Sequence, residues 1–188
     1  MSNDAIITLS DPRSAAAEAY RTLRTNIEFS SVDEPLHTLL VTSSAPTENK
    51  SVAVANLAVA MADGDRPVIL VDADLRRPSQ HTLFGLPNDK GFTNLFRNSE
   101  ALDNPPFQSV PNTSLRLLTS GPLPSIPSQL LASQKMAEVI ERLAALADMV
   151  IFDAPPLITV NDASLLASRV DGVLLVVKAG DTKRDRKS

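Results

Sequence analysis

The sequence predicts an α/β fold, with a doubly wound, mostly parallel sheet and helices on both of its faces. One observation is a set of five short apolar runs, most of them continuous rather than alternating, as in strands buried on both faces. The other is that helical patterns lie between several of these runs, so that strands and helices alternate along the chain. A length of 188 residues suits one domain with a single core.

The expected strands are the apolar runs at residues 37–42, 68–71, 115–118, 149–152 and 172–177. The expected helices are the intervening patterns at residues 50–61, 133–147 and 161–168. Two segments break this alternation. Residues 97–114 are polar and contain Pro and Asn, which predicts a surface loop. Residues 121–128 read GPLPSIPS, which predicts a stiff loop that forms neither a helix nor a central strand.

The domain organisation follows from the same pattern. We expect residues 1–182 to form one domain and the basic segment 183–188 to be a frayed tail. An open α/β sheet usually ends with a helix that covers its last strand. The sequence stops before such a helix, so we expect the sheet to be missing its last covering helix.

Composition excludes several classes of function. The net charge of −4 and a pI near 5.2 argue against a nucleic-acid partner, because phosphate backbones attract basic surfaces. The absence of cysteine excludes disulfides and cysteine metal sites and favours a cytoplasmic location. We find no signal-peptide pattern and no apolar run approaching the ~18 residues that span a bilayer, so we expect no direct membrane insertion.

The polar segment Ser43–Ser51 follows the first expected strand and opens the first expected helix. Backbone amides and the helix dipole point at an anion there, which is where a phosphate loop belongs. Lys50 could reach the β and γ phosphates of a nucleotide, and the Ser51 hydroxyl could bind Mg²⁺. Ser44 and Asn49 stand at the two glycine positions of the usual pattern G-x-x-x-x-G-K-[ST], which predicts weakened rather than abolished binding. A polar strand-to-helix turn is the alternative interpretation.

Acidic residues follow two other expected strands. Asp72 and Asp74 close the second, and Asp153 closes the fourth. Ligands of open α/β sheets bind at the carboxyl ends of the strands, where paired carboxylates can hold Mg²⁺ or accept a hydroxyl proton. Asp72 and Asp74 would face the same side if the strand continued through both. Solvated charges at strand ends are the alternative.

Several motifs lie along the chain: Glu18-Ala-Tyr-Arg21-Thr-Leu-Arg24-Thr-Asn26, Asp72-Ala-Asp-Leu-Arg-Arg-Pro78, Gly121-Pro122 through Leu130-Leu131, Asp153-Ala-Pro-Pro156, Asp162-Ala163, and Val170 to Gly180. Together they resemble the bacterial tyrosine kinases of capsule and exopolysaccharide synthesis. That family belongs to the deviant-Walker-A P-loop ATPases, which include the cell-division ATPase MinD. The resemblance runs from about Asp11 to Thr182 and implies a P-loop NTPase fold.

The resemblance also implies the cofactors ATP and Mg²⁺, and phosphate transfer to tyrosines of a neighbouring subunit. The implied nucleotide-binding residues are Thr47, Glu48, Asn49, Lys50, Ser51 and Val52. The implied catalytic residues are Lys50, Asp72 and Asp74, and the implied metal ligands are Ser51, Asp72 and Asp153. Glu18, Arg21 and Arg24 match a motif that builds a ring of subunits in that family, and their spacing places them on roughly one helix face. The implied activator is the cytoplasmic tail of a membrane polysaccharide co-polymerase, which would recruit the chain to the inner face of the membrane.

The chain departs from the family pattern, and these departures leave three hypotheses. Thr47, Asn49 and Val52 replace two glycines and a threonine of the family loop. Tyr20 is the only tyrosine, so we expect no phosphorylation of a tyrosine-rich tail in this sequence. The first hypothesis is an ATP-dependent protein-tyrosine kinase module that regulates polysaccharide polymerisation and export. The second is a pseudokinase that assembles with the export machinery. The third is a MinD- or ParA-like ATPase, against which Ala45 stands where those proteins carry a signature lysine.

Overall fold

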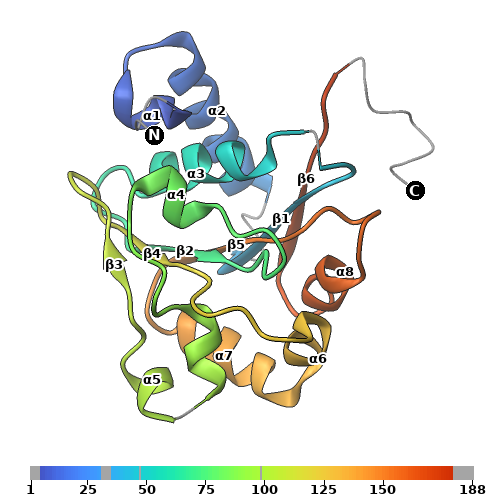
Figure 1. Cartoon of the computed structure of the whole chain (residues 1–188). Helices are drawn as coiled ribbons and strands as arrows, with labels where there is room; N and C mark the ends of the chain where they lie inside the picture. The colour runs from blue at the N-terminus through green and yellow to red at the C-terminus, as the bar shows by residue number, and fades with distance from the viewer. Residues whose placement is uncertain (1–4, 31–34, 47, 98, 180–188) are drawn as a thin grey trace.

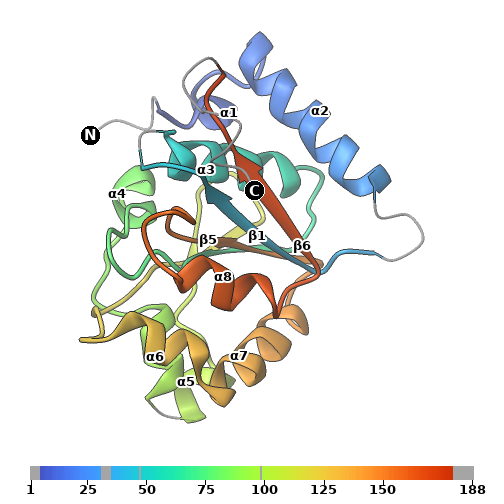
Figure 2. The ribbon, with the colours of Figure 1, turned by 90° about the vertical axis from the view of Figure 1, so that its right-hand side faces the viewer.

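The computed structural model describes residues 5–30, 35–46, 48–97 and 99–179. These residues form a six-stranded sheet with the strand order β3-β4-β2-β5-β1-β6. The strands are β1 (Thr38–Ser43), β2 (Val68–Asp72), β3 (Gln108–Ser109), β4 (Leu115–Leu118), β5 (Met149–Asp153) and β6 (Gly172–Val176). Every pair is parallel except β3 with β4. Figure 2 shows β1 and β6 side by side and pointing the same way. The mostly parallel sheet is therefore confirmed.

Helices cover both faces of this sheet (Figure 1). The helices are α1 (Ile7–Ser10), α2 (Ala15–Ser30), α3 (Lys50–Met61), α4 (Gln80–Phe84), α5 (Ser99–Asp103), α6 (Pro127–Ala132), α7 (Gln134–Ala144) and α8 (Asp162–Ala167), with a 3₁₀ helix, η2 (Phe92–Phe96). Helices α1 to α4 lie on one side, and α5 to α8 with η2 lie on the other. The doubly wound arrangement is confirmed as well.

The alternation of strand side chains creates two cores. One set of strand residues packs under α3 and α2: Leu39, Val41, Val68, Leu70, Leu115, Leu117 and Ile151. The neighbouring residues face α7, α8 and η2: Leu40, Ile69, Val71, Val150 and Phe152. Asp72 and Asp153 lie two residues beyond Leu70 and Ile151. The period of two in a strand therefore directs both acids to the α3 side.

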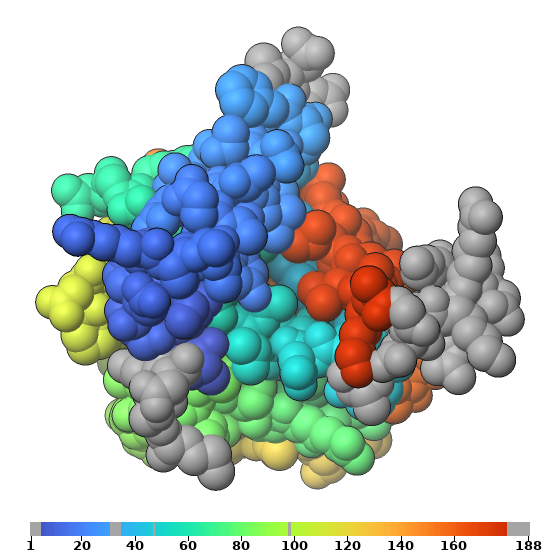
Figure 3. Space-filling model, turned by 90° about the horizontal axis from the view of Figure 1, so that it is seen from above, coloured from blue at the N-terminus to red at the C-terminus, as the bar shows by residue number. Residues whose placement is uncertain are grey.

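Helix α3 is enclosed between the sheet and the N-terminal helices, which explains why it is apolar on all sides. The side-chain amide of the buried Asn56 makes the contacts to the N-terminal segment. Its oxygen accepts from the backbone N–H (3.0 Å) and the hydroxyl (3.1 Å) of Thr8, and its nitrogen donates to the carbonyl of Ala5 at 3.1 Å. The N-terminal segment is thereby fastened to α3. Seen from above, part of the surface near the start of α3 lies between the N-terminal helices and β6 (Figure 3).

The structure corrects two expectations for irregular segments. Residues 121–128 do not remain a loop throughout, because α6 begins at Pro127. Proline fits there since the first turn of a helix has no partner for its N–H groups. The segment 97–114 contains α5 and the antiparallel edge strand β3 in addition to loop. The expected tail at 183–188 lies outside the described residues, as does the chain end where we expected a covering helix to be missing.

The helices of the described part of the chain do not include one that is both long and apolar enough to cross a bilayer.

Candidate functional site

The loop between β1 and α3 has the backbone geometry that a phosphate loop needs at its last position. Asn49 precedes α3 with φ 51° and ψ 32°, in the left-handed region. Asparagine enters this region more readily than most residues, so the chain keeps without glycine the turn that a motif glycine would provide. The Asn49 side chain is exposed and makes no capping hydrogen bond.

Lys50 and Asp153 form a buried ion pair across 103 positions of sequence. Lys50 is the first residue of α3 and Asp153 the last of β5, and their side chains are 6% and 0% exposed. The ammonium of Lys50 also lies 3.3 Å from the hydroxyl of Ser51. Removing two charges from water is expensive, so each charge is tolerated here because the other is present.

Asp72 lies beside Asp153 in the register of β2 with β5 and is fully buried. Its Oδ2 accepts hydrogen bonds from the backbone amides of Ser79 (3.0 Å) and Gln80 (2.9 Å). Its Oδ1 is buried and receives no hydrogen bond from any described residue. Burial raises the pKa of Asp72 well above its ordinary value, and the charge of Asp153 raises it further. The Gln80 amide and the charge of Lys50 oppose this rise.

Asp74 shapes the loop that follows β2. The strand ends at Asp72, so the alternation that would have placed both acids on one side does not extend to Asp74. Its Oδ1 instead accepts hydrogen bonds from the backbone amides of Arg76 (3.3 Å) and Arg77 (3.0 Å). The Arg76 guanidinium then bonds both oxygens of the buried Asp162, at 2.7 and 3.1 Å. This bidentate pair fastens the acidic loop to α8.

The oxygen atoms at this edge of the sheet suit a magnesium ion. The Ser51 hydroxyl and the carboxylates of Asp72 and Asp153 are the hard oxygen donors that Mg²⁺ prefers. Oδ1 of Asp72 lacks a partner that a cation or its water could supply. Within the described ranges, no three His, Cys, Asp or Glu side chains converge to enclose a metal. Mg²⁺ needs no such cage, since it keeps several waters and shares its remaining positions with substrate phosphates.

The other expected loop residues have different surroundings. The buried carboxylate of Glu48 points toward the backbone of its own loop. Its Oε1 accepts a hydrogen bond from the Ser44 hydroxyl at 2.8 Å, and its Oε2 accepts one from the backbone N–H of Ala45 at 3.0 Å. Glu48 therefore stabilises the loop from within. Val52 is half-buried in the first turn of α3, and Thr47 lies outside the described residues.

The three motif residues of α2 lie away from this site. Arg21 bonds Glu18 at 2.9 Å and the carbonyl of Pro12 at 2.6 Å, and Arg24 bonds the carbonyl of Ala60 at 2.9 Å. Both guanidinium groups thus help to hold α2 within the chain, while the Glu18 side chain remains 68% exposed.

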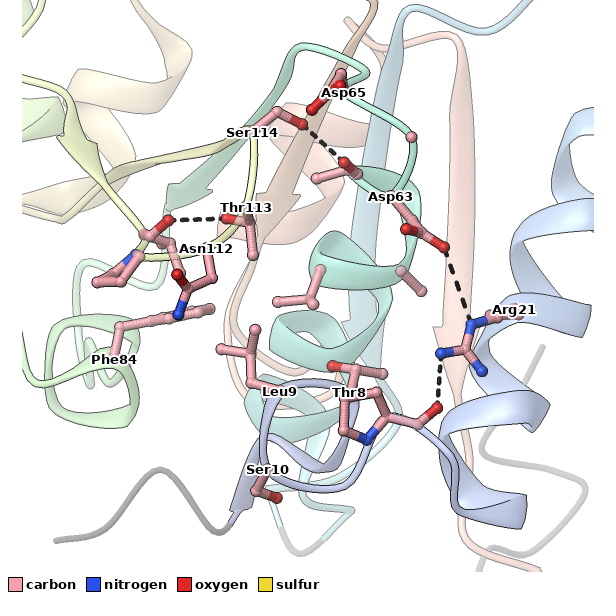
Figure 4. A pocket seen from close by; sticks show the side chains of 17 residues that line it. Thr8, Leu9, Ser10, Arg21, Asp63, Asp65, Phe84, Asn112, Thr113 and Ser114 are labelled. Atoms are coloured by element: carbon pink, nitrogen blue, oxygen red, sulfur yellow. Dashed lines mark hydrogen bonds and ion pairs between the residues drawn. The ribbon is translucent and has the colours of Figure 1, made fainter.

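A cavity of about 500 Å³ lies beside this motif (Figure 4). It is bounded by α1, the end of α3 and the turn between β3 and β4, and Arg21 points across its wall to Asp63. The cavity lies at the end of α3 remote from Lys50 and includes none of the expected nucleotide-binding residues. The cavity is therefore separate from the cluster of Lys50, Asp72 and Asp153.

Gln80 is a site residue that the sequence analysis missed. It is fully buried at the start of α4, and its amide nitrogen donates to Oδ2 of Asp153 at 2.7 Å and to the carbonyl of Ser51 at 3.0 Å. The only cue in the sequence is the Pro78-Ser79 pair before it, which is typical of a helix start. That cue predicts a helix but gives no reason to single out the glutamine side chain.

Comparison with known proteins gives a consistent set of relatives. The tyrosine-protein kinase YwqD of Bacillus subtilis is 42% identical over 181 residues, which cover 96% of this chain and 76% of that protein. The putative tyrosine-protein kinase CapB of Staphylococcus aureus is 36% identical, with 94% of this chain and 76% of that protein covered. No protein-family profile matches the chain.

Solved structures agree with these relatives. The crystal structure of the chimerical protein CapA2B2 superposes with a TM-score of 0.91 at 35% identity, covering 98% of this chain and 80% of that one. The MinD protein of Pyrococcus horikoshii in complex with Mg-ADP has a TM-score of 0.62 at 20% identity, covering 75% of this chain and 57% of that one. The likeness to MinD shows the P-loop NTPase fold alone.

Proposed function

The chain belongs to the family of bacterial tyrosine-protein kinases, and from that premise we propose that it is an ATP-dependent protein-tyrosine kinase module regulating the polymerisation and export of capsular polysaccharide or exopolysaccharide. The observation that carries the proposal is the cluster at the carboxyl edge of the sheet. There, Lys50 at the start of α3 pairs with Asp153, and Asp72 lies in register beside it. A lysine at a helix start next to two strand-end carboxylates is the arrangement that phosphoryl transfer requires.

Different residues of the site bind different parts of the nucleotide and its metal ion. The backbone amides at the start of α3 face the phosphates, helped by the left-handed turn at Asn49. Lys50 exchanges its partner Asp153 for the β and γ phosphates and neutralises charge that develops on them. Ser51, Asp72 and Asp153 would hold Mg²⁺, which would neutralise negative charge on the phosphates.

The transfer step joins the tyrosine oxygen to the γ phosphorus while the bond between that phosphorus and the β–γ bridging oxygen breaks, leaving ADP. The hydroxyl proton passes to a carboxylate of Asp72 or Asp74. Tyr20 is poorly placed to be the acceptor, because it packs half-buried against the core under α2. Burial also raises the pKa of Tyr20, which makes its phenolate less accessible.

The test is transfer of labelled γ-phosphate from ATP with Mg²⁺ to a tyrosine-containing peptide. We expect phosphotyrosine to form, and Lys50→Met to lower the rate at least ~100-fold. Lys90→Met, at an exposed lysine, serves as the matched control and leaves the rate unchanged. Release of free phosphate without phosphotyrosine would favour an ATPase. No heat of binding at millimolar ATP with Mg²⁺ would favour a pseudokinase.

The proposal extends to assembly at the membrane. We infer self-association into a ring through α2, and activation by the cytoplasmic tail of a membrane polysaccharide co-polymerase that recruits the chain to the inner face of the membrane. Since Arg21 and Arg24 bond within the chain, the exposed Glu18 is the motif residue most available to a second subunit. Light scattering should show a smaller assembly for Glu18→Ala but not for Glu138→Ala on the exposed face of α7. An unchanged assembly for Glu18→Ala would contradict this role.

A further inference from the structure

We propose that Gln80 is a positioning residue that holds the Asp153 carboxylate in place for Mg²⁺ when Lys50 leaves it for the nucleotide. This inference rests on the proposed function. It adds to that function a residue outside the phosphate loop and outside the strand-end acids.

The contacts of Gln80 link three parts of the site. Its side-chain nitrogen donates to Oδ2 of Asp153 at 2.7 Å and to the carbonyl of Ser51 at 3.0 Å. Its backbone nitrogen donates to Oδ2 of Asp72 at 2.9 Å. One residue therefore fixes the last residues of β2 and β5 relative to the first turn of α3. It is 0% exposed, so water does not compete for these bonds.

The orientation of the amide follows from its partners. Both contacts of the side chain are to oxygen atoms that can only accept, so the nitrogen and not the carbonyl oxygen must face them. The carbonyl oxygen, Oε1, is then left buried without a hydrogen-bond donor among the described residues. Oδ1 of Asp72 is in the same condition. A buried oxygen without a donor is unfavourable, and a hydrated cation could offset that cost.

The two oxygens of Asp153 have separate partners. Oδ1 pairs with Lys50, and Oδ2 accepts from Gln80. When Lys50 turns to the phosphates, the ion pair is lost and the bond from Gln80 remains. Because an amide is neutral, it holds the carboxylate without cancelling the charge that attracts Mg²⁺. A second cation in its place would compete with the metal.

The experiment separates Mg²⁺ affinity from nucleotide affinity. Calorimetry measures ADP binding to the protein in EDTA, and a Mg²⁺ titration at saturating ADP gives the half-saturating Mg²⁺ concentration. Gln80→Met keeps the length of the side chain and removes the donor, and the exposed Gln129→Met of α6 is the matched control. We expect Gln80→Met to raise the half-saturating Mg²⁺ about tenfold, as loss of a residue that orients a metal ligand does, with ADP affinity in EDTA within about twofold.

Gln80→Asn is the second variant, in case the first does not fold. Its shorter amide cannot span both acceptors, so the same rise in Mg²⁺ is expected. An unchanged Mg²⁺ requirement in a variant that binds ADP, or an equal loss of ADP affinity with and without Mg²⁺, would overturn the role of Gln80 and leave the proposed function standing. Failure of the unaltered protein to bind ADP under either condition would overturn the proposed function, and this inference with it.

Discussion

Replacing Lys50 by methionine should destabilise the nucleotide-free protein, because the ion pair with Asp153 is buried. The two side chains are 6% and 0% exposed, so neither charge can return to water without disturbing the site. Breaking one side of a buried pair costs about 3–5 kcal/mol. Because Gln80 still bonds the other oxygen of Asp153, we expect the lower end, about 3 kcal/mol. With a slope of about 2 kcal/mol per molar urea, the unfolding midpoint falls by about 1.5 M.

A double-mutant cycle tests this explanation. Asp153→Asn alone should also cost about 3 kcal/mol, because it leaves Lys50 buried without a counter-charge. The combined variant carries no charge at either position and should cost only about 1–2 kcal/mol, which gives a coupling energy of about 4–5 kcal/mol. Urea unfolding followed by far-UV circular dichroism measures all four proteins, and Lys90→Met is the control for loss of a lysine. Additive losses would refute the argument that the buried pair, rather than each side chain alone, stabilises this edge of the sheet.

Three further predictions concern the loops and the start of the sheet. Asn49→Gly should tighten ADP binding measured by calorimetry, because it keeps the turn at φ 51° and removes a side chain near the phosphates; equal affinity would show that the asparagine is no obstacle. Gly91→Ala should lower the free energy of unfolding by about 3 kcal/mol in urea, because the new Cβ would lie 2.0 Å from the carbonyl oxygen of Thr119. Gly64→Ala is its control, since that site is open, and only its positive φ should cost about 1 kcal/mol. Asp171 has a lowered pKa: burial tends to raise it, but bonds from the Thr38 hydroxyl and two backbone amides outweigh burial. The stability that Asp171 adds over Asp171→Asn is fully present above the unfolded pKa of about 4 and is lost as the pH falls through the lower folded pKa. The urea midpoints of the two proteins should therefore differ at pH 7 and converge once the pH falls below that lowered pKa.

Most of the strands and helix α3 could be predicted because their residues carry strong local signals. The five apolar runs became β1, β2, β4, β5 and β6 with ends shifted by about one residue, and α3 begins and ends at the residues expected. Among the short elements, α8 was predicted, whereas α4, α5, η2 and β3 were not. The 3₁₀ helix η2 is held by the amides of Phe92 and Thr93, which donate to the carbonyls of Thr119 (2.7 Å) and Ser120 (3.0 Å). A segment whose hydrogen bonds go to a distant loop has no periodic pattern of its own.

The sequence by itself determined which side chains stand at the carboxyl ends of the strands, because strand limits and the positions of Asp72 and Asp153 are local features. Only the tertiary structure decided their partners. Lys50 meets Asp153 across 103 residues, Gln80 meets Asp153 across 73, and Arg24 caps the end of α3 rather than pointing to solvent. These contacts depend on which strands are neighbours in the sheet and which helix covers them. Strand order and layer packing are set by the burial of the whole apolar core and not by any single segment.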